Sequence, residues 1–242
     1  MLSFALLIFA CFIFGGMPSG YWLAKALKGI DIREHGSGST GATNVWRCVS
    51  KPAGVTVFLL DLLKGFFPVL LAIHLTEGRL SAEWQFLPDH AAPVAAALAT
   101  LVGHSKSVFL GFRGGKSAAT GLGTLFAMKW QVGSATFLSW LTLVLVTKIV
   151  SVASIAGSLL CGIYFFLFHA PFAYVVYGGL AFVYITIRHK ANLKRLCKGE
   201  EPKYTDKPKA PAASGLAGEA PGQPAERSAA SSPGEGRSTA NG

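Results

Sequence analysis

Apolar residues fill long runs of the chain as far as Ile187, and short polar segments separate these runs. A run of about twenty apolar residues is long enough to cross the hydrocarbon core of a membrane as an α-helix. The pattern therefore predicts an all-α, polytopic membrane protein with seven transmembrane helices. The expected spans are Leu2–Leu23, Pro52–Leu75, Pro88–His104, two within Ser117–Val150, Ser151–Phe168 and Pro171–Ile187.

The ends and breaks of two segments give further expectations. Lys129 and Trp130 interrupt Ser117–Val150, so we expect two short spans there, with one span plus a surface helix as the alternative. The first segment lacks the basic start and small-residue cleavage site of a signal peptide, so we expect it to remain in the mature protein. Pro18 near its end is expected to kink the helix.

Composition agrees with a membrane protein, since 51% of the 242 residues are hydrophobic and only 14% are charged. The net charge of +10 could indicate nucleic-acid binding, but the basic residues lie beside the apolar runs, as the positive-inside rule describes. With seven spans, that rule places the N-terminus outside and the C-terminus in the cytoplasm. We therefore expect no nucleic-acid partner, and the positive charge also suits an anionic substrate.

The chain changes character near its end, where Pro, Ala, Ser, Gly and charged residues replace the apolar runs. This segment has too little apolar surface to offset the conformational entropy that it would lose on folding. We therefore expect a membrane domain at 1–203 and a disordered cytoplasmic tail at 204–242. The four cysteines are scattered and are expected to be free thiols. The six histidines show no metal-ligand spacing, so we expect neither a metal nor another cofactor.

The first polar segment, Gly36–Arg47, has the sequence GSGSTGATNVWR and no hydrophobic period, which predicts a structured loop. Hydroxyls, loop amides and a guanidinium together suit the binding of phosphate oxygens. The alternative is an ordinary polar loop. Its candidate site residues are Ser37, Gly38, Thr43, Asn44 and Arg47.

The second polar segment lies within Leu101–Gly123, where Lys116 follows a glycine pair and an apolar run begins directly afterwards. A helix that opens there turns its free N–H groups toward the loop and stabilises an anion. This is not a P-loop, because Leu110 stands where that motif requires glycine. The alternative is a basic loop between two spans. Its candidate residues are His104, Gly114, Gly115, Lys116 and Thr120.

Two further pairs of polar residues complete the candidate chemistry. Asp61 and Lys64 are three residues apart within an apolar run, so they share a helix face and could pair. That pair either orients a site or holds two helices together, because charges at membrane depth face the protein interior or a water-filled cavity. His189 and Asn192, in the basic segment after the last run, also share a face of a continuing helix.

These segments resemble the bacterial acyl-phosphate:glycerol-3-phosphate acyltransferase family of the PlsY type. GSGSTGATNVWR resembles the family's GSGNxGATNVxR, GHSKSVFLGFRGGKSAATGLG resembles GHxxPxFxxFxGGKGxATxxG, and RHKANLKRLCKGEE resembles RHxxNIxRLxxGxE. Asp61 and Lys64 resemble the family's DxxKG. The resemblance covers residues 1–203 in order. The chain departs from the patterns at Ser39, Thr40, Ser107, Ser117 and Ala191, which affects the geometry of the loops.

The resemblance implies seven transmembrane helices with an active site facing the cytoplasm of a bacterial cell, in the inner membrane. It implies transfer of an acyl group from acyl phosphate to the 1-hydroxyl of glycerol 3-phosphate, giving lysophosphatidate and phosphate. This would be the first acylation of phospholipid synthesis. The implied partners are these substrates, membrane lipid and, functionally, the enzyme that makes acyl phosphate from acyl carrier protein.

The residues suit that chemistry, because acyl phosphate is already activated and needs orientation and charge stabilisation more than a strong nucleophile. We assign one phosphate to Ser37 and Arg47, and the other to Lys116. His189 and Asn192 would close the site, with His189 acting either as a general base or as a phosphate ligand. The remaining candidates would bind substrate, with Asp61 and Lys64 behind them. A transporter for a small phosphorylated anion is the competing function.

Overall fold

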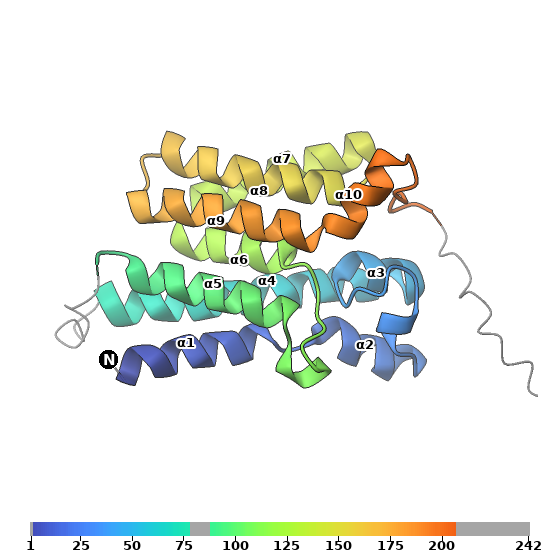
Figure 1. The fold of residues 1–242 in the computed structure, drawn as a ribbon, viewed down its shortest axis with the longest axis horizontal. Coiled ribbons are helices and arrows are strands. Elements are labelled where there is room, and N and C mark those ends of the chain that lie inside the picture. The colour runs from blue at the N-terminus through green and yellow to red at the C-terminus, as the bar shows by residue number, and fades with distance from the viewer. Residues whose placement is uncertain (1, 78–87, 207–242) are drawn as a thin grey trace, which may run out of the picture. The chain divides into compact units, whose positions relative to one another are not determined.

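The computed structural model describes residues 2–77 and 88–206, and all the regular structure in these ranges is helical. The helices α1 to α9 run back and forth along a common direction, and the start of α1 lies at the opposite end from α10 (Figure 1). Their bounds are α1 Leu2–Gly15, α2 Ser19–Lys28, α3 Ala42–Cys48, α4 Lys51–Glu77, α5 Ala91–Ser105, α6 Ala118–Met128, α7 Trp130–Thr147, α8 Val150–Leu167, α9 Phe172–Arg188 and α10 Lys190–Cys197, with short 3₁₀ turns η1 at Ile32–Glu34 and η3 at Val108–Leu110.

Five helices of the described residues are long and apolar enough to cross a membrane. They comprise α1 with α2, α4, α5 with η3, α7 and α8. α6 and α9 lie where two further spans were expected, but they have only 11 and 17 residues. α6 packs against α4 and α7 and is largely buried, so it is not the surface helix of the alternative. The count of seven spans stays a prediction.

The first apolar segment breaks between Gly15 and Ser19, as Pro18 predicted. A break takes backbone carbonyls out of the regular hydrogen bonding of a helix. Two side chains from other segments donate to them: Ser107 Oγ to Gly16 O at 2.5 Å, and Lys64 Nζ to Met17 O at 2.7 Å, where Ser19 N also donates. The break is therefore bound to both α4 and the segment after α5.

α4 and α6 cross at very short range, which requires glycine at the contact. A Cβ on Gly65 would lie 2.0 Å from Thr120 O, and one on Gly123 would lie 1.9 Å from Leu62 O. Small residues of this kind let helix backbones approach closely within membranes. The contact fixes the start of α6, and with it Lys116, against the middle of α4.

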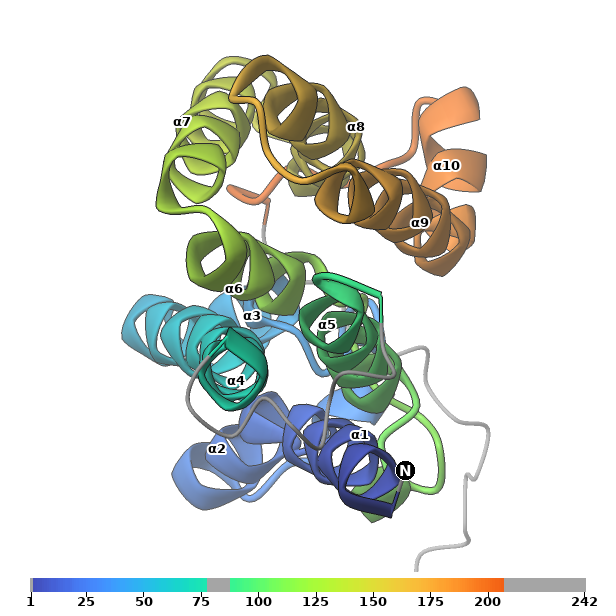
Figure 2. The ribbon, with the colours of Figure 1, turned by 90° about the vertical axis from the view of Figure 1, so that its left-hand side faces the viewer.

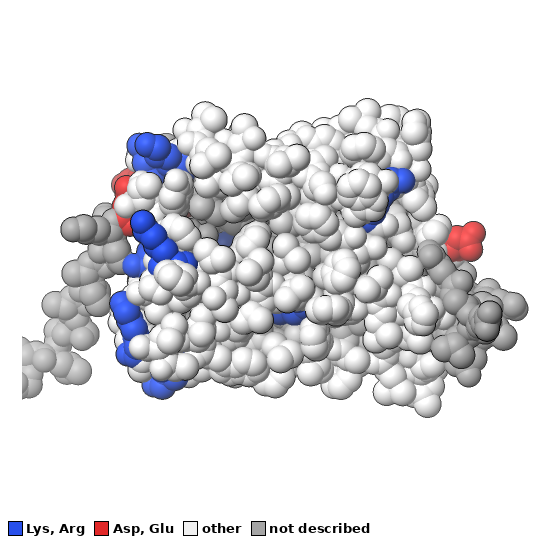
Figure 3. All heavy atoms as spheres, turned by 180° about the vertical axis from the view of Figure 1, so that it is seen from behind, with Lys and Arg blue, Asp and Glu red and all other residues white. Residues whose placement is uncertain are grey.

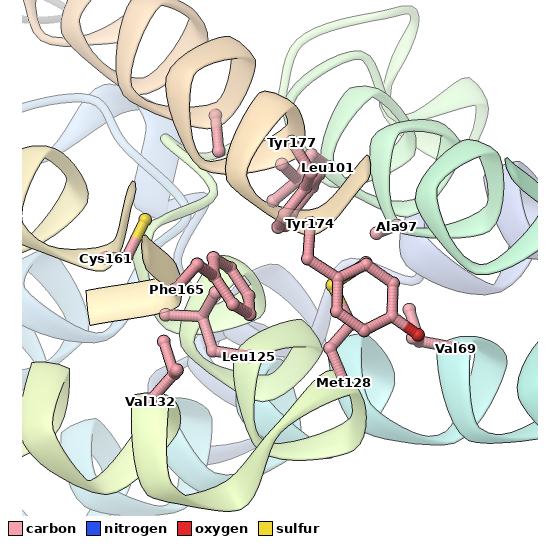
Figure 4. Packing of buried hydrophobic residues seen from close by; sticks show 11 residues of the cluster. Val69, Ala97, Leu101, Leu125, Met128, Val132, Cys161, Phe165, Tyr174 and Tyr177 are labelled. Atoms are coloured by element: carbon pink, nitrogen blue, oxygen red, sulfur yellow. The ribbon is translucent and has the colours of Figure 1, made fainter. Parts of the chain in front are cut away.

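The largest apolar core lies between α4, α5, α6, α7, α8 and α9 (Figure 4). Phe165 and Tyr177 are its largest fully buried side chains, and their rings meet edge to face with centroids 6.4 Å apart. The Tyr177 hydroxyl hydrogen-bonds Thr124 Oγ1 at 2.5 Å, which satisfies the one polar atom of the ring. This core holds the helices that surround the candidate site.

Charged residues gather at one end of the described molecule. Figure 3 shows most visible Lys and Arg side chains at the end that carries α2, α3 and α10 in Figure 1, with a broad belt beside them in which few charged atoms are visible. Exposed Leu59, Leu70, Leu138 and Leu145 belong to the long helices. An apolar belt with a basic end is the surface expected of an integral membrane protein.

Some expectations differ from the structure or lie outside it. Gly36–Arg47 is a loop only in its first half, because α3 begins at Ala42 and packs on α4 with Val45 fully buried. The described chain continues past 203, since Tyr204 stacks edge-on against Trp46. Residues 207–242 of the expected tail and 78–87 of the expected outer loop lie outside the described residues.

Candidate active site

A cavity of about 150 Å³ lies between the helices α3 to α10, the loop before α3 and the segment Glu201–Pro202. Most of the predicted site residues line it, although they come from distant parts of the sequence. They are Ser37, Thr43, Asn44, Arg47, Asp61, His104, Lys116, His189 and Asn192. Gly38, Lys64, Gly114, Gly115 and Thr120 do not line the cavity, but each adjoins, contacts or lies close to a residue that does.

Lys116 and Asn192 form the centre of this site. Lys116 Nζ donates to Asn192 Oδ1 at 2.8 Å, and Asn192 Nδ2 donates to Glu201 Oε1 at 2.5 Å. Burial lowers the pKa of Lys116 to about 8 from its ordinary 10.5, although the nearby Glu201 raises it. An ammonium with few protein partners in a buried site is suited to bind an anion.

His189 lies at the junction of α9 and α10 and is 4% exposed. Its Nδ1 is 2.8 Å from Ile185 O, and a carbonyl oxygen only accepts, so Nδ1 carries the proton. Burial lowers the pKa of His189 to about 4, against the opposing hydrogen bond to Ile185. The imidazole is therefore neutral near pH 7, with a free electron pair on Nε2.

Arg47 approaches the cavity from α3. Its guanidinium donates to Pro202 O at 2.9 Å, while Nε is buried without a hydrogen-bond partner in the described structure. Burial lowers the pKa of Arg47, and Glu201 opposes that shift. A buried donor without a partner costs free energy unless a ligand or water satisfies it, so Nε is a candidate contact for an anion.

Asn44 holds the loop that precedes α3. Its Nδ2 donates to Ile32 O, His35 O and Ser39 O, and its Oδ1 accepts from Ser37 N at 2.9 Å. These contacts use the amide within the loop, and they position Ser37 at the cavity. Gly38 has φ +68°, a conformation that favours glycine, and gives the loop its turn.

The segment between α5 and α6 folds tightly around His104. Gly115 N donates to His104 O at 3.2 Å, and a Cβ on Gly115 would lie 2.1 Å from His104 Nε2. A Cβ on Gly114 would likewise clash with His104 O. Thr120 Oγ1 lies 3.2 Å from His104 Nδ1, so the ring is held between the loop and α6.

Arg188 and Ser117 fix the same segment. Arg188 donates to Gly115 O at 3.2 Å, beside Lys116, and so ties the end of α9 to the loop. Ser117 has φ +64° at the start of α6, where the resembling pattern has glycine. Its Oγ donates to Leu101 O at 2.7 Å, which compensates part of the cost of that left-handed backbone.

Asp61 and Lys64 form the expected ion pair, with Nζ to Oδ1 at 2.8 Å and both side chains almost fully buried. Asp61 Oδ1 also accepts from Ser19 Oγ at 2.5 Å and lies 3.8 Å from His104 Nδ1. These contacts agree with the interpretation that the pair holds helices together, and a role in orienting a site stays a prediction. The pair holds α4 to the break before α2, and Asp61 faces His104 at the cavity.

Glu201 and Arg195 also line the cavity, and the sequence analysis did not single them out. Glu201 Oε1 accepts from Ser151 Oγ at 2.8 Å as well as from Asn192, and Oε2 accepts from Arg195 Nε at 2.7 Å. Burial alone would raise the pKa of Glu201, but these hydrogen bonds lower it overall. Both residues match fixed letters of the third pattern, RHxxNIxRLxxGxE, and that match was the available signal.

Together these groups can bind an anion and accept a proton. Lys116 and Arg47 supply positive charge, the first N–H groups of α6 lie beside Lys116, and His189 supplies a neutral base. In the described residues, no group of three His, Cys, Asp or Glu side chains could hold a metal ion. Fold and site thus define a helical membrane protein with a cavity lined by groups that could bind an anion.

Comparison with known proteins specifies the family. The family model for glycerol-3-phosphate acyltransferase matches residues 5–199. A glycerol-3-phosphate acyltransferase of Nostoc sp. is 41% identical over 208 residues, covering 83% of this chain and 91% of the relative. One of Gloeobacter violaceus is 43% identical over 197 residues, covering 81% and 93%.

Solved structures agree with the sequence relatives. A crystal structure of PlsY (YgiH), an integral membrane glycerol 3-phosphate acyltransferase in its glycerol 3-phosphate form, superposes with a TM-score of 0.75 at 36% identity. It covers 83% of this chain and 95% of the other. The lysophosphatidic acid form of PlsY gives a TM-score of 0.72 at 35% identity. The chain therefore belongs to the glycerol-3-phosphate acyltransferase (PlsY) family, which favours an enzyme over a transporter.

Proposed function

We propose that this protein transfers a fatty acyl group from acyl phosphate to the 1-hydroxyl of glycerol 3-phosphate. The products are lysophosphatidate and inorganic phosphate, and the reaction is the first acylation of phospholipid synthesis. The observation that carries the proposal is the convergence of Arg47, Lys116, His189 and Asn192 on one cavity. Two of the solved relatives are named for glycerol 3-phosphate and lysophosphatidic acid forms, which supports these as substrate and product.

The reaction needs little covalent chemistry from the protein. The 1-hydroxyl oxygen attacks the acyl carbonyl carbon, the bond from that carbon to the phosphate oxygen breaks, and phosphate leaves with the electron pair. The hydroxyl proton goes to His189 Nε2 or to a phosphate oxygen. The protein's part is to orient the two reactants and stabilise the developing negative charge, as in other electrostatic catalysts.

We assign roles by position in the cavity. Lys116, Asn192 and the start of α6 hold one phosphate, and Arg47 with Ser37 and Thr43 holds the other. Arg47 Nε, which is buried without a partner in the described structure, supports this assignment. Gly38, Asn44, Gly114, Gly115 and Thr120 act by shaping the loops that present these groups, as their backbone and hydrogen-bond geometry suggests.

We further propose that the site faces the cytoplasm of a bacterial inner membrane. Seven spans, with α6 and α9 as short ones, would put the N-terminus outside and residues 204–242 inside. The basic end of the molecule (Figure 3) supports this orientation, because cytoplasmic ends of membrane proteins are rich in Lys and Arg. A cytoplasmic site would also meet acyl phosphate made there from acyl carrier protein.

The test is an assay with purified protein, radiolabelled glycerol 3-phosphate, and acyl phosphate or acyl-CoA as donor. We expect lysophosphatidate to form with acyl phosphate and not with acyl-CoA. Lys116→Ala and Arg47→Ala should abolish product formation in protein that remains folded, whereas Lys190→Ala, an exposed residue of α10, should not. Product from acyl-CoA alone would disprove the proposed donor, and full activity of either variant would disprove its phosphate role.

A further inference from the structure

After α10 the described chain continues along the cavity at residues 201–204, and we call this segment the strap. In the end-on view it runs from α10 behind α8 and α9 toward α7 (Figure 2). Glu201 and Pro202 line the cavity. Pro202 and Tyr204 lie beyond the last letter of the third pattern and beyond residues 5–199, which the family model matches. The family resemblance therefore assigns no role to either residue.

The strap is attached to the protein at both of its ends. At one end, Glu201 Oε1 accepts a hydrogen bond from Ser151 Oγ at 2.8 Å, and Ser151 belongs to the first turn of α8. At the other end, Tyr204 N donates to Lys148 O at 2.9 Å, in the turn between α7 and α8. Because both ends are fixed, the carbonyl oxygen of Pro202 between them has a defined position beside the cavity.

The carbonyl oxygen of Pro202 is an acceptor for Arg47. Arg47 Nη2 donates to it at 2.9 Å, and Arg47 Nε is buried without a hydrogen-bond partner among the described residues. The donors of a guanidinium have a fixed, planar arrangement, so a partner at one nitrogen sets the direction of the others. The strap therefore orients Arg47 while it leaves Nε available for an anion.

Tyr204 also acts on α3 through Trp46, the residue before Arg47. The two rings meet edge to face with centroids 6.4 Å apart. On α4, a Cβ on Gly54 would lie 2.5 Å from Trp46 Cβ, so Trp46 packs directly against that helix. α3 has seven residues and is too short to be stable alone, so such contacts decide where it lies. Trp46 is thus held between α4 and Tyr204.

We propose that Tyr204 is a positioning residue of the phosphate site, which holds Arg47 in the orientation that binds phosphate. The inference rests on the proposed function, in which Arg47 holds one of the two phosphates. Tyr204 does not line the cavity, so it acts through the Trp46 ring and the Pro202 carbonyl. An arginine that is already oriented loses less conformational freedom when the phosphate binds, which strengthens binding.

The test measures KM for both substrates in Tyr204→Ala. Removal of the ring should raise KM about fivefold for one substrate, because Arg47 then has to be ordered during binding. That substrate should be the one whose KM Arg47→Lys also raises, since lysine lacks the planar donor set. KM for the other substrate and kcat should stay within about twofold of the parent protein. Tyr204→Phe keeps the edge-to-face ring contact and should retain the parent KM.

KM separates positioning from a loss of stability alone. A variant that only unfolds more readily has fewer active molecules, which lowers the maximal rate and leaves KM unchanged. Thr205→Ala is the matched control, because it truncates the exposed neighbour of Tyr204, and it should retain the parent KM. In the Arg47→Lys background, Tyr204→Ala should cause no further rise in KM, because its effect passes through Arg47.

Unchanged KM values for both substrates in Tyr204→Ala would overturn the inference, as would a further rise in the Arg47→Lys background. A rise of the same size in Thr205→Ala would also overturn it. If the protein uses acyl-CoA instead, the proposed donor fails, and KM is compared in the same variants with that donor. If it uses neither, the proposed function fails, and calorimetry with inorganic phosphate decides. Equal affinities of Tyr204→Ala and Tyr204→Phe would then reject the positioning role, and weaker binding by Tyr204→Ala would support it.

Discussion

Lys116 Nζ donates a 2.8 Å hydrogen bond to Asn192 Oδ1 and so joins two segments that are 76 residues apart in sequence. One partner comes from the start of α6 and the other from α10, and Glu201 holds the far side of the Asn192 amide. The contact aims an ammonium into the cavity without neutralising it. It also means that the two residues should act as one unit in binding a phosphate.

We predict that the effects of Lys116→Ala and Asn192→Ala are not additive. Each single variant should lower kcat/KM by about 10²–10³, as expected for loss of one group that stabilises charge in a transition state. The double variant should be little worse than the worse single one, because each residue positions the other. Steady-state kinetics of the four proteins measure this. Losses that multiply would show that the residues act independently.

The pKa values of Lys116 and His189 predict the pH profile of kcat/KM. In its proposed role Lys116 has to be protonated to bind phosphate, and with its pKa lowered to about 8, kcat/KM should fall as pH rises through about 8. If His189 is the proposed base, it has to be neutral, and its pKa of about 4 keeps it neutral down to about pH 5. Initial rates across pH give both limbs.

Lys116→Arg is the control for that profile, because arginine stays charged throughout the range. The alkaline limb should disappear in this variant, whatever activity remains. An alkaline limb at the same pH in Lys116→Arg would assign it to another group. A profile of wild-type protein that is flat from pH 7 to 9.5 would contradict the role of Lys116.

Glu201→Gln should destabilise the folded protein by about 2 kcal/mol, because a buried, charged acceptor of three hydrogen bonds becomes a neutral one. The neighbouring Glu200 is exposed, so Glu200→Gln should change stability by less than about 0.5 kcal/mol. Thermal unfolding of the two variants in the same detergent measures the difference. Equal midpoints would show that Glu201 does not hold the site together.

Asp61→Ala should be more harmful than the double variant Asp61→Asn with Lys64→Met. The single change leaves the Lys64 ammonium buried without its carboxylate, which costs about 3–5 kcal/mol. The double change removes both charges together, and its cost should be clearly smaller. Yield of folded protein and thermal midpoint report this order. The reverse order would mean that the pair contributes to the fold by something other than charge compensation.

The long apolar runs of the sequence predicted helices correctly, whereas a short helix without a clear hydrophobic period was not predicted. The apolar runs predicted the positions of α4, α5, α7, α8 and α9 well, and Pro18 predicted the break in the first segment. The short helix α3 was missed because seven residues carry no recognisable period. It forms because Val45 packs against α4, which is a tertiary effect.

In the candidate site, too, the sequence predicted the residues but not all of their contacts. The residue types that bind phosphate, with the three patterns they belong to, predicted that Arg47, Lys116 and His189 would matter, and the structure brings them to one cavity. Sequence could not show that Asn44 is occupied by its own loop, or that Pro202 accepts from Arg47. Both facts depend on how the chain folds back on itself, and no local pattern records them.

The break between α1 and α2 has a consequence for how the protein is made. Met17 O receives a side-chain donor from Lys64, 47 residues later, in addition to Ser19 N, and Gly16 O receives one from Ser107, 91 residues later. A nascent chain that ends before Ser107 therefore enters the bilayer with the Gly16 carbonyl oxygen lacking this hydrogen-bond donor. Completion of that helix has to wait for translation of the segment after α5, so N-terminal fragments should be poor insertion intermediates and ready substrates for membrane proteases.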